Sequence, residues 1–140
     1  MNDITTRTER INFLEEWANE LESPYYHQTY GMLCDEDILN EDDKIVYNHC
    51  ALGVACSLIG IDNEHLKQYN TVEEIDCLND RYVGKLWKYL LCDEKMVNRI
   101  YKMNDEKKET FPQIAQEIRE YVKDLLFIKN NKNKEGETAS

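Results

Sequence analysis

The sequence has no apolar run near its start, because residues 1–10 are polar and mixed in charge. A secretory signal or an N-terminal anchor needs such a run, so neither is expected. The most apolar stretch, residues 48–60, is also shorter than the roughly 20 residues that a bilayer-crossing helix requires. We therefore predict a cytoplasmic protein that does not enter a membrane.

Basic residues are few, with 17 Lys and Arg against 28 Asp and Glu, which gives a formal net charge of −11. No basic patch interrupts the acidic surface predicted from this balance, so direct binding to nucleic acid phosphates is not expected. Two interpretations remain. In the first, which we favour, the acidic surface simply keeps the protein soluble. In the second, the acidic surface mimics DNA and binds a DNA-binding protein.

Motifs that carry well-known chemistry are scarce as well. The five cysteines are odd in number, scattered and without a CxxC pair, so we expect reduced thiols and neither a disulfide framework nor a zinc site. A nucleophile elbow and a glycine-rich phosphate loop are both missing. The acidic stretch over 35–43 has Leu39 at its fifth position and no glycine, which does not fit a calcium loop. No metal or cofactor is predicted.

Residues 48–60 carry no charged side chain when histidine is counted as neutral. Asn48 is suited to cap a helix at its start, and Gly60 suits the left-handed position after its last turn. Apolar side chains fall on every face of that helix, as expected for a helix enclosed by protein. We predict that this is the central helix of the fold.

Amphipathic spacing predicts further helices around this centre. The first runs from Thr6 or Thr8 to Leu21, with Trp17 as the anchor of its buried face. Thr110 and Gln113 form a capping box with a proline between them, which is the clearest helix start in the chain. The other two predicted helices span 80–91 and 93–105.

The tyrosine-rich segment before the central helix is the least helical part. It predicts a small β-hairpin that pairs Thr29–Leu33 with Lys44–Tyr47. The expected fold is mainly α, with about five helices packed around the 48–60 helix and one hairpin. We predict a single domain over 1–128, followed by a disordered polar tail over 129–140.

Cys50 is the candidate nucleophile, because a thiol in the first turn of a helix has its pKa lowered by the helix dipole. His49 points away from it on a helix, so the base would be His27 or His65. The competing interpretation, which we favour, is a buried structural thiol.

A second candidate site is a small polar pocket at the end of the central helix. Its proposed ligand-binding residues share polar or aromatic side chains in the two segments that flank the helix. They are Tyr26, Gln28, Tyr30, Asn104 and Asp105. Capping and ordinary packing are the simpler roles for all five.

Three further tyrosines, Tyr69, Tyr82 and Tyr89, suggest an exposed stripe that could form the face of a homo-oligomer.

Several short motifs follow one another in a fixed order along the chain. They are Trp17, then Tyr26, Gln28 and Leu33, then CALGVACSL over 50–58, MND over 103–105 and FPQIAQEI over 111–118. This series resembles a family of short, uncharacterised phage and prophage proteins with a CxLGVxCxL helix followed by an (L/M)ND and FxxIAxxI segment. The resemblance covers nearly all of the predicted folded chain.

The chain departs from that family pattern at three places. His49 stands where a second cysteine is frequent, Met103 replaces leucine, and an acidic stretch separates Leu33 from Lys44. The His49 departure argues against a mechanism that needs vicinal cysteines. The resemblance implies an accessory protein that binds something of the host, such as a defence enzyme, a nucleotide signal or a regulator.

Three functions are therefore weighed. The favoured one is a non-enzymatic protein, in the host cytoplasm if phage-encoded, that blocks a host protein or sequesters a small nucleotide or metabolite. The second is a cysteine-dependent hydrolase that uses Cys50. The third is a DNA-mimic inhibitor, motivated by the net charge of −11.

Overall fold

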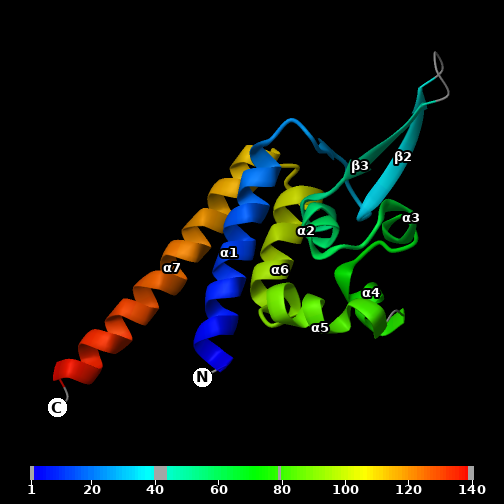
Figure 1. Ribbon diagram of the computed structural model, residues 1–140. Helices are drawn as coiled ribbons and strands as arrows, with labels where there is room; N and C mark the ends of the chain where they lie inside the picture. Colours follow the sequence, from blue (N-terminus) through cyan, green and yellow to red (C-terminus); the bar gives the residue numbers. More distant parts are fainter. Residues whose placement is uncertain (1, 40–43, 79, 139–140) are drawn as a thin grey trace.

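The computed structural model describes residues 2–39, 44–78 and 80–138. Over these residues the chain is mainly helical with a small sheet, which confirms the predicted fold class (Figure 1). The elements are α1 (Asn2–Glu22), β1 (His27–Gln28), β2 (Cys34–Leu39), β3 (Lys44–His49), α2 (Ala51–Ile59), α3 (Asn63–Leu66), α4 (Val72–Leu78), η1 (Asp80–Tyr82), α5 (Val83–Leu86), η2 (Trp87–Leu91), α6 (Glu94–Tyr101), η3 (Lys102–Glu106) and α7 (Phe111–Thr138).

The predicted central helix is α2, and most of its side chains are buried. Gly60 ends it in the left-handed conformation, with φ of 113°, as its position predicted. The predicted start was wrong, because Cys50 and not Asn48 is the N-cap. Asn48 and His49 belong to β3, whose ladder of backbone hydrogen bonds holds them extended until the helix begins.

The long helices α1 and α7 lie side by side (Figure 1). The capping box that opens α7 is confirmed: the Thr110 backbone N–H donates to Gln113 Oε1 at 2.8 Å, and Gln113 N–H donates to Thr110 Oγ1 at 3.4 Å. Trp17 of α1 is buried and donates its indole N–H to the Ala51 carbonyl at 2.8 Å. The predicted anchor residue therefore joins α1 directly to the first turn of α2.

The predicted hairpin has the wrong first strand. The antiparallel pair is β2 with β3, in a register that places Cys34 opposite His49 and Ile38 opposite Ile45. The expected strand over 29–33 is instead a turn in which Gly31 adopts a φ of 79°, a conformation incompatible with a strand. Two residues of β1 add to the other side of β3 in parallel. Residues 40–43, which include three of the acidic residues of the 35–43 stretch, lie outside the described residues.

Other helices also differ from the prediction, both in their boundaries and in how the chain is divided among them. The segment 61–80 holds the short helices α3 and α4, and the predicted 80–91 helix is divided into η1, α5 and the π-helical turn η2. The structure continues α7 to Thr138, where a disordered tail was predicted from residue 129; residues 139–140 lie outside the description. Extending an existing helix needs no new nucleus, and Lys and Glu are good helix formers.

The three tyrosines predicted to form an exposed stripe do not form one. Tyr69 and Tyr82 are buried, and Tyr89 stacks on Phe13 with ring centroids 4.5 Å apart. These rings complete the core instead of offering a face for a second copy. None of the described helices has the length and apolar character that crossing a lipid bilayer demands.

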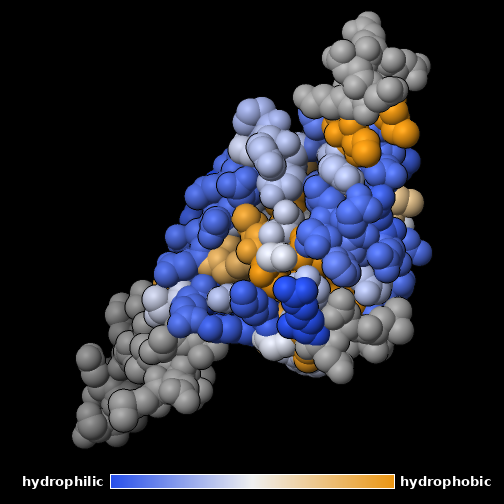
Figure 2. All heavy atoms as spheres, turned by 45° about the vertical axis from the view of Figure 1, so that its right-hand side comes forward, coloured by the Kyte–Doolittle hydropathy of each residue, from blue (hydrophilic) through white to orange (hydrophobic). Residues whose placement is uncertain are grey.

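The hairpin of β2 and β3, called the arm below, projects away from the helices (Figure 1). A hydrophobic area lies on this arm beside the grey residues (Figure 2). Among the side chains of the arm that the structure describes, Ile38 and Ile45 are the exposed large apolar ones, at 64% and 47% exposure. Because they face each other across the two strands, the arm presents one apolar pair to solvent.

Candidate functional site

Asn104 is a buried polar residue beside the start of α2, with only 1% of its surface exposed. Its Oδ1 accepts hydrogen bonds from Gln28 Nε2 at 2.9 Å and from the Ala51 N–H at 3.2 Å. Its Nδ2 donates to the Thr29 carbonyl at 2.9 Å and to Asp105 Oδ1 at 2.7 Å. One amide therefore ties the turn before β2, the start of α2 and η3 together.

The backbone around Asn104 is a π-helical turn, η3. The Lys107 N–H donates to the Lys102 carbonyl at 2.9 Å, five residues back in place of the usual four. Such widened turns are rare and frequently lie at functional sites. Here the wide turn holds the buried Asn104 side chain, which reaches two segments outside its own turn, residues 28–29 and the start of α2.

The structure brings together three of the five predicted ligand-binding residues, namely Gln28, Asn104 and Asp105. Tyr26 lies elsewhere, with its hydroxyl donating to Ser57 Oγ at 3.2 Å. Tyr30 is exposed beside the ammonium group of a lysine, so neither tyrosine joins the Asn104 network.

A cavity of about 100 Å³ opens beside this network, between the N-terminal ends of α2 and α4 and the segment from α6 to η3. Its lining includes four apolar side chains. They are Leu33, Leu52, Val72 and Val97. Its polar lining includes Asn104, Asp105 and Glu73, with the ring of Tyr101 also present. Of the five predicted residues, Asn104 and Asp105 line this cavity, whereas Gln28 contacts Asn104 without lining it.

Cys50 also lines the cavity and is the N-cap of α2, its Sγ accepting a hydrogen bond from the Gly53 N–H at 3.3 Å. The thiol residue is only 5% exposed, and burial raises its pKa to about 12 despite the helix dipole. The thiol is therefore protonated at neutral pH. The predicted lowering of this pKa is wrong because desolvation outweighs the helix terminus.

The two candidate bases for Cys50 engage other groups or face solvent. His27 is exposed on β1, and His65 Nδ1 lies 2.8 Å from Asp62 Oδ1 on α3. Within the described part of the chain, no histidine forms a hydrogen bond with the Cys50 thiol. The geometry therefore holds a capping thiol without a hydrogen-bonded general base.

His49 is a buried polar residue that no sequence pattern marked as part of a site. Its Nε2 lies 2.8 Å from Asn63 Oδ1, while its Nδ1 is buried without a hydrogen-bond partner. The ring of Tyr26 meets it edge-on at 5.0 Å. Burial lowers the pKa of His49, so the neutral ring is favoured in the folded state. Its place at the inward end of β3 depends on the register, which the sequence did not reveal.

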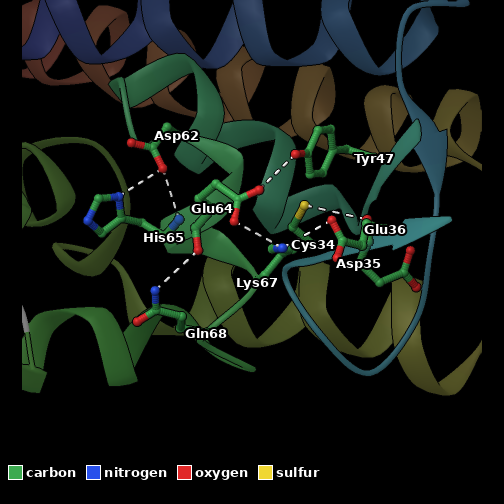
Figure 3. Close-up of polar contacts among 9 residues, drawn as sticks. All are labelled: Cys34, Asp35, Glu36, Tyr47, Asp62, Glu64, His65, Lys67 and Gln68. Atoms are coloured by element: carbon green, nitrogen blue, oxygen red, sulfur yellow. Dashed lines mark hydrogen bonds and ion pairs between the residues drawn. The ribbon is translucent and has the colours of Figure 1, made fainter. Parts of the chain in front are cut away.

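Polar contacts fix the base of the arm to α3 (Figure 3). The Tyr47 hydroxyl donates to Glu64 Oε1 at 2.8 Å, and Lys67 Nζ lies 3.0 Å from carboxylate oxygens of both Glu36 and Glu64. The hydrogen bond from Tyr47, aided by Lys67, lowers the pKa of Glu64. The arm is thus held at its base, while Ile38 and Ile45 lie farther out along the strands.

The arm also has an acidic edge. In the strand order β1-β3-β2, β2 is an outer strand, and it carries Asp35, Glu36 and Asp37. The Asn48 amide donates to Asp35 Oδ1 at 2.7 Å and to Asp37 Oδ2 at 2.9 Å. These contacts hold two carboxylates on one face of the sheet without supplying a positive charge.

No protein-family model, no curated protein and no solved structure matches this chain.

Proposed function

We propose that this protein is a non-enzymatic accessory protein of the phage type that docks on a host protein through the arm and blocks it in the host cytoplasm. The observation that carries the proposal is the exposed Ile38–Ile45 pair on a projecting hairpin. An apolar pair held in solvent adds nothing to the core. It is the kind of surface that becomes buried when a partner binds.

The charge of the arm favours a basic partner. Asp35 and Asp37 lie along β2, where Glu36 pairs with Lys67, and the chain as a whole carries a net charge of −11. Nucleic acid and a second copy of this chain are both acidic, so the same field disfavours them. A host protein with an apolar patch framed by Lys or Arg has the complementary chemistry.

The outer edge of β2 offers a further means of attachment. An outer strand presents unpaired backbone N–H and C=O groups, to which an extended segment of a partner can add as a new strand. The carboxylates of β2 suppress such pairing between copies of this protein, while a basic strand would be attracted. Backbone pairing and the Ile38–Ile45 contact would act together.

The state of Cys50 supports binding over cysteine catalysis. A nucleophilic thiol needs access and a lowered pKa, whereas Cys50 is buried and its pKa is raised to about 12. Its hydrogen bond from Gly53 N–H gives it a structural role at the start of α2.

The test is affinity capture of host proteins by the tagged protein and two double variants. In the arm variant, Ile38→Thr with Ile45→Thr, the β-branched residues keep strand propensity and remove the apolar pair. In the control, Leu126→Gln with Phe127→Gln, a different exposed apolar pair is removed from α7. Mass spectrometry identifies what each sample retains in stoichiometric amount.

We expect a basic host protein with the unmodified chain and with the α7 control, and its loss with the arm variant. Photo-crosslinking from position 38 should reach the same protein. Retention by the arm variant, or the absence of any stoichiometric protein from all tested bacterial hosts, would contradict the proposal.

A further inference from the structure

We propose that the cavity between the N-terminal ends of α2 and α4 binds a small organic monocation, an alkylammonium group whose charge lies between Glu73 and Asp105. This site is separate from the arm and does not depend on the function proposed above. Its walls come from four parts of the chain, namely the residue before β2, α2, the start of α4, and the segment from α6 to η3.

The size of the cavity sets the size of the ligand. An apolar cavity of about 150 Å³ accommodates benzene, so the volume of about 100 Å³ here fits a short alkyl chain with one polar group. Leu33, Leu52 and Val97 supply apolar wall for the chain. Since all three are buried, that wall is already formed in the absence of a ligand.

The charge of the lining selects a cation. Glu73 and Asp105 line the cavity, and no lysine, arginine or histidine that the structure describes does so. No ion pair among the described residues engages either carboxylate. The start of α2 contributes about half a positive charge, which does not offset the two carboxylates, so the lining keeps a net negative charge. That net charge favours a positively charged ligand.

The donors at the start of α2 are already used, which disfavours an anion. The Ala51 N–H donates to Asn104 Oδ1 at 3.2 Å, and the Gly53 N–H donates to the Cys50 thiol at 3.3 Å. Asp105 receives the Asn104 amide on Oδ1 at 2.7 Å, which fixes its orientation. A phosphate or carboxylate would meet two carboxylates and find these donors occupied.

Tyr101 adds a surface that suits the same ligand. It is 38% exposed and lines the cavity. The face of an aromatic ring attracts an ammonium group, more strongly where water is excluded. A carboxylate pair, an aromatic ring and an apolar wall together form the usual surroundings of an organic ammonium ion.

The experiment is calorimetric titration of the full chain with n-butylammonium chloride. The matched probes n-butanol and butyrate have similar chains and carry no charge or the opposite charge. The test variant is Glu73→Gln with Asp105→Asn, which keeps an acceptor for the Asn104 amide. The control is Glu94→Gln, an exposed carboxylate on α6 that does not line the cavity. Methyl NMR shifts of Val72 and Val97 in the unmodified chain locate the bound probe.

We expect saturable binding of n-butylammonium that shifts both valine methyl signals and that butanol and butyrate do not reproduce. The double variant should weaken it roughly tenfold or more, and Glu94→Gln should leave it unchanged. Equal binding of butanol, or unchanged affinity in the double variant, would overturn the proposal. If the double variant does not fold, the valine shifts and the probe comparison still decide.

A parallel titration with Nα-acetyl-lysine amide separates two sources of the same chemistry. If both probes bind, the cavity also accepts a lysine side chain presented by a polypeptide. If only n-butylammonium binds, the ligand is a free amine, and if only the lysine probe binds, the ligand is a lysine side chain. Failure of both probes would overturn the inference.

Discussion

The surroundings of α2 and the outer part of the arm both carry aliphatic side chains, but they use them differently. Around α2, Leu52, Val54 and Ile59 are buried, and a tryptophan indole and an asparagine amide satisfy groups of its first turn. On the arm, Ile38 and Ile45 remain in solvent. Burial of apolar area is what stabilises a fold. The first region therefore carries stability, and the second is available for contact with another molecule.

Replacing one glycine of α2 should destabilise the central region more than any other change considered below. A Cβ added at Gly53 of α2 would overlap the Leu33 carbonyl oxygen, a backbone atom that cannot rotate away. We expect Gly53→Ala to lower the free energy of unfolding by more than about 3 kcal/mol, or to prevent folding. Denaturant-induced unfolding measures this change in the free energy of unfolding.

The matched control is Gly84→Ala. Gly84 lies in the helix α5, and nothing is within 4 Å of an added Cβ. Stability should stay unchanged or rise by up to about 1 kcal/mol. If Gly53→Ala and Gly84→Ala lowered the free energy of unfolding equally, the close approach of Gly53 to the Leu33 backbone would not explain the loss.

The Asn104 network should give the next largest effect. Asn104→Leu keeps the side-chain volume but leaves the Ala51 N–H and the Thr29 carbonyl without their partner. We expect a loss of about 2 kcal/mol in urea unfolding, the usual cost of unsatisfied buried groups. Asn12→Leu on the exposed face of α1 should change stability by less than about 0.5 kcal/mol. A smaller loss of stability for Asn104→Leu than for Asn12→Leu would contradict the structural role of the Asn104 network.

Lowering the pH should reduce the stability of the folded protein, because His49 is buried. Burial lowers its pKa in the folded chain below the ordinary value of 6.5, so the unfolded chain binds the proton more readily. Stability is then complete above pH 6.5 and falls as the pH drops through 6.5 toward the folded-state pKa. Thermal melts between pH 7 and 5 should show this fall, and His49→Gln should reduce it.

The exposed His27→Gln is the control for this pH experiment. It should leave the slope of stability against pH as in the unmodified protein. Carboxylates whose pKa is lowered by a partner, such as Glu64, contribute stability that is lost only as the pH falls below the ordinary carboxyl pKa of 4.5. That pH lies outside the range of this experiment. An unchanged slope in the His49 variant would rule out His49 as the source.

The arm should show the smallest effect on stability. Replacing Ile38 and Ile45 by threonine removes area that is already largely solvated, so the free energy of unfolding should change by less than about 0.5 kcal/mol. Differential scanning calorimetry checks this. A large loss would mean that the apolar pair belongs to the fold, and the contrast between the two regions would disappear.

Local sequence signals predicted several elements well. The Thr110–Gln113 box, the start of the 93–105 helix and the left-handed Gly60 were all recognisable because each depends on residues within a few positions. The hairpin was misplaced because the tyrosines of 25–30 have strand propensity, while Gly31 turns the chain and acidic residues occupy β2. Propensity could not foresee charged side chains on an outer strand, where solvent accepts them.

The candidate site was predictable only in part. Asn104, Asp105 and Gln28 were selected as polar residues at the end of the central helix, and they do come together, although at its start. Glu73 and Tyr101 were missed, because no local pattern connects α4 or the end of α6 with the start of α2. The burial of Cys50, which raises its pKa, likewise depends on what surrounds the helix.

By itself the sequence determined that the stretch without charges over 48–60 must be enclosed, that other amphipathic helices must enclose it, and that the surface is acidic. Those outcomes follow from hydrophobic periodicity and composition, which act within short stretches. Only the tertiary structure decided which carboxylates meet at the cavity, which register exposes Ile38 and Ile45, and where His49 is buried. These depend on contacts between segments far apart in the chain, whose pairing no local pattern specifies.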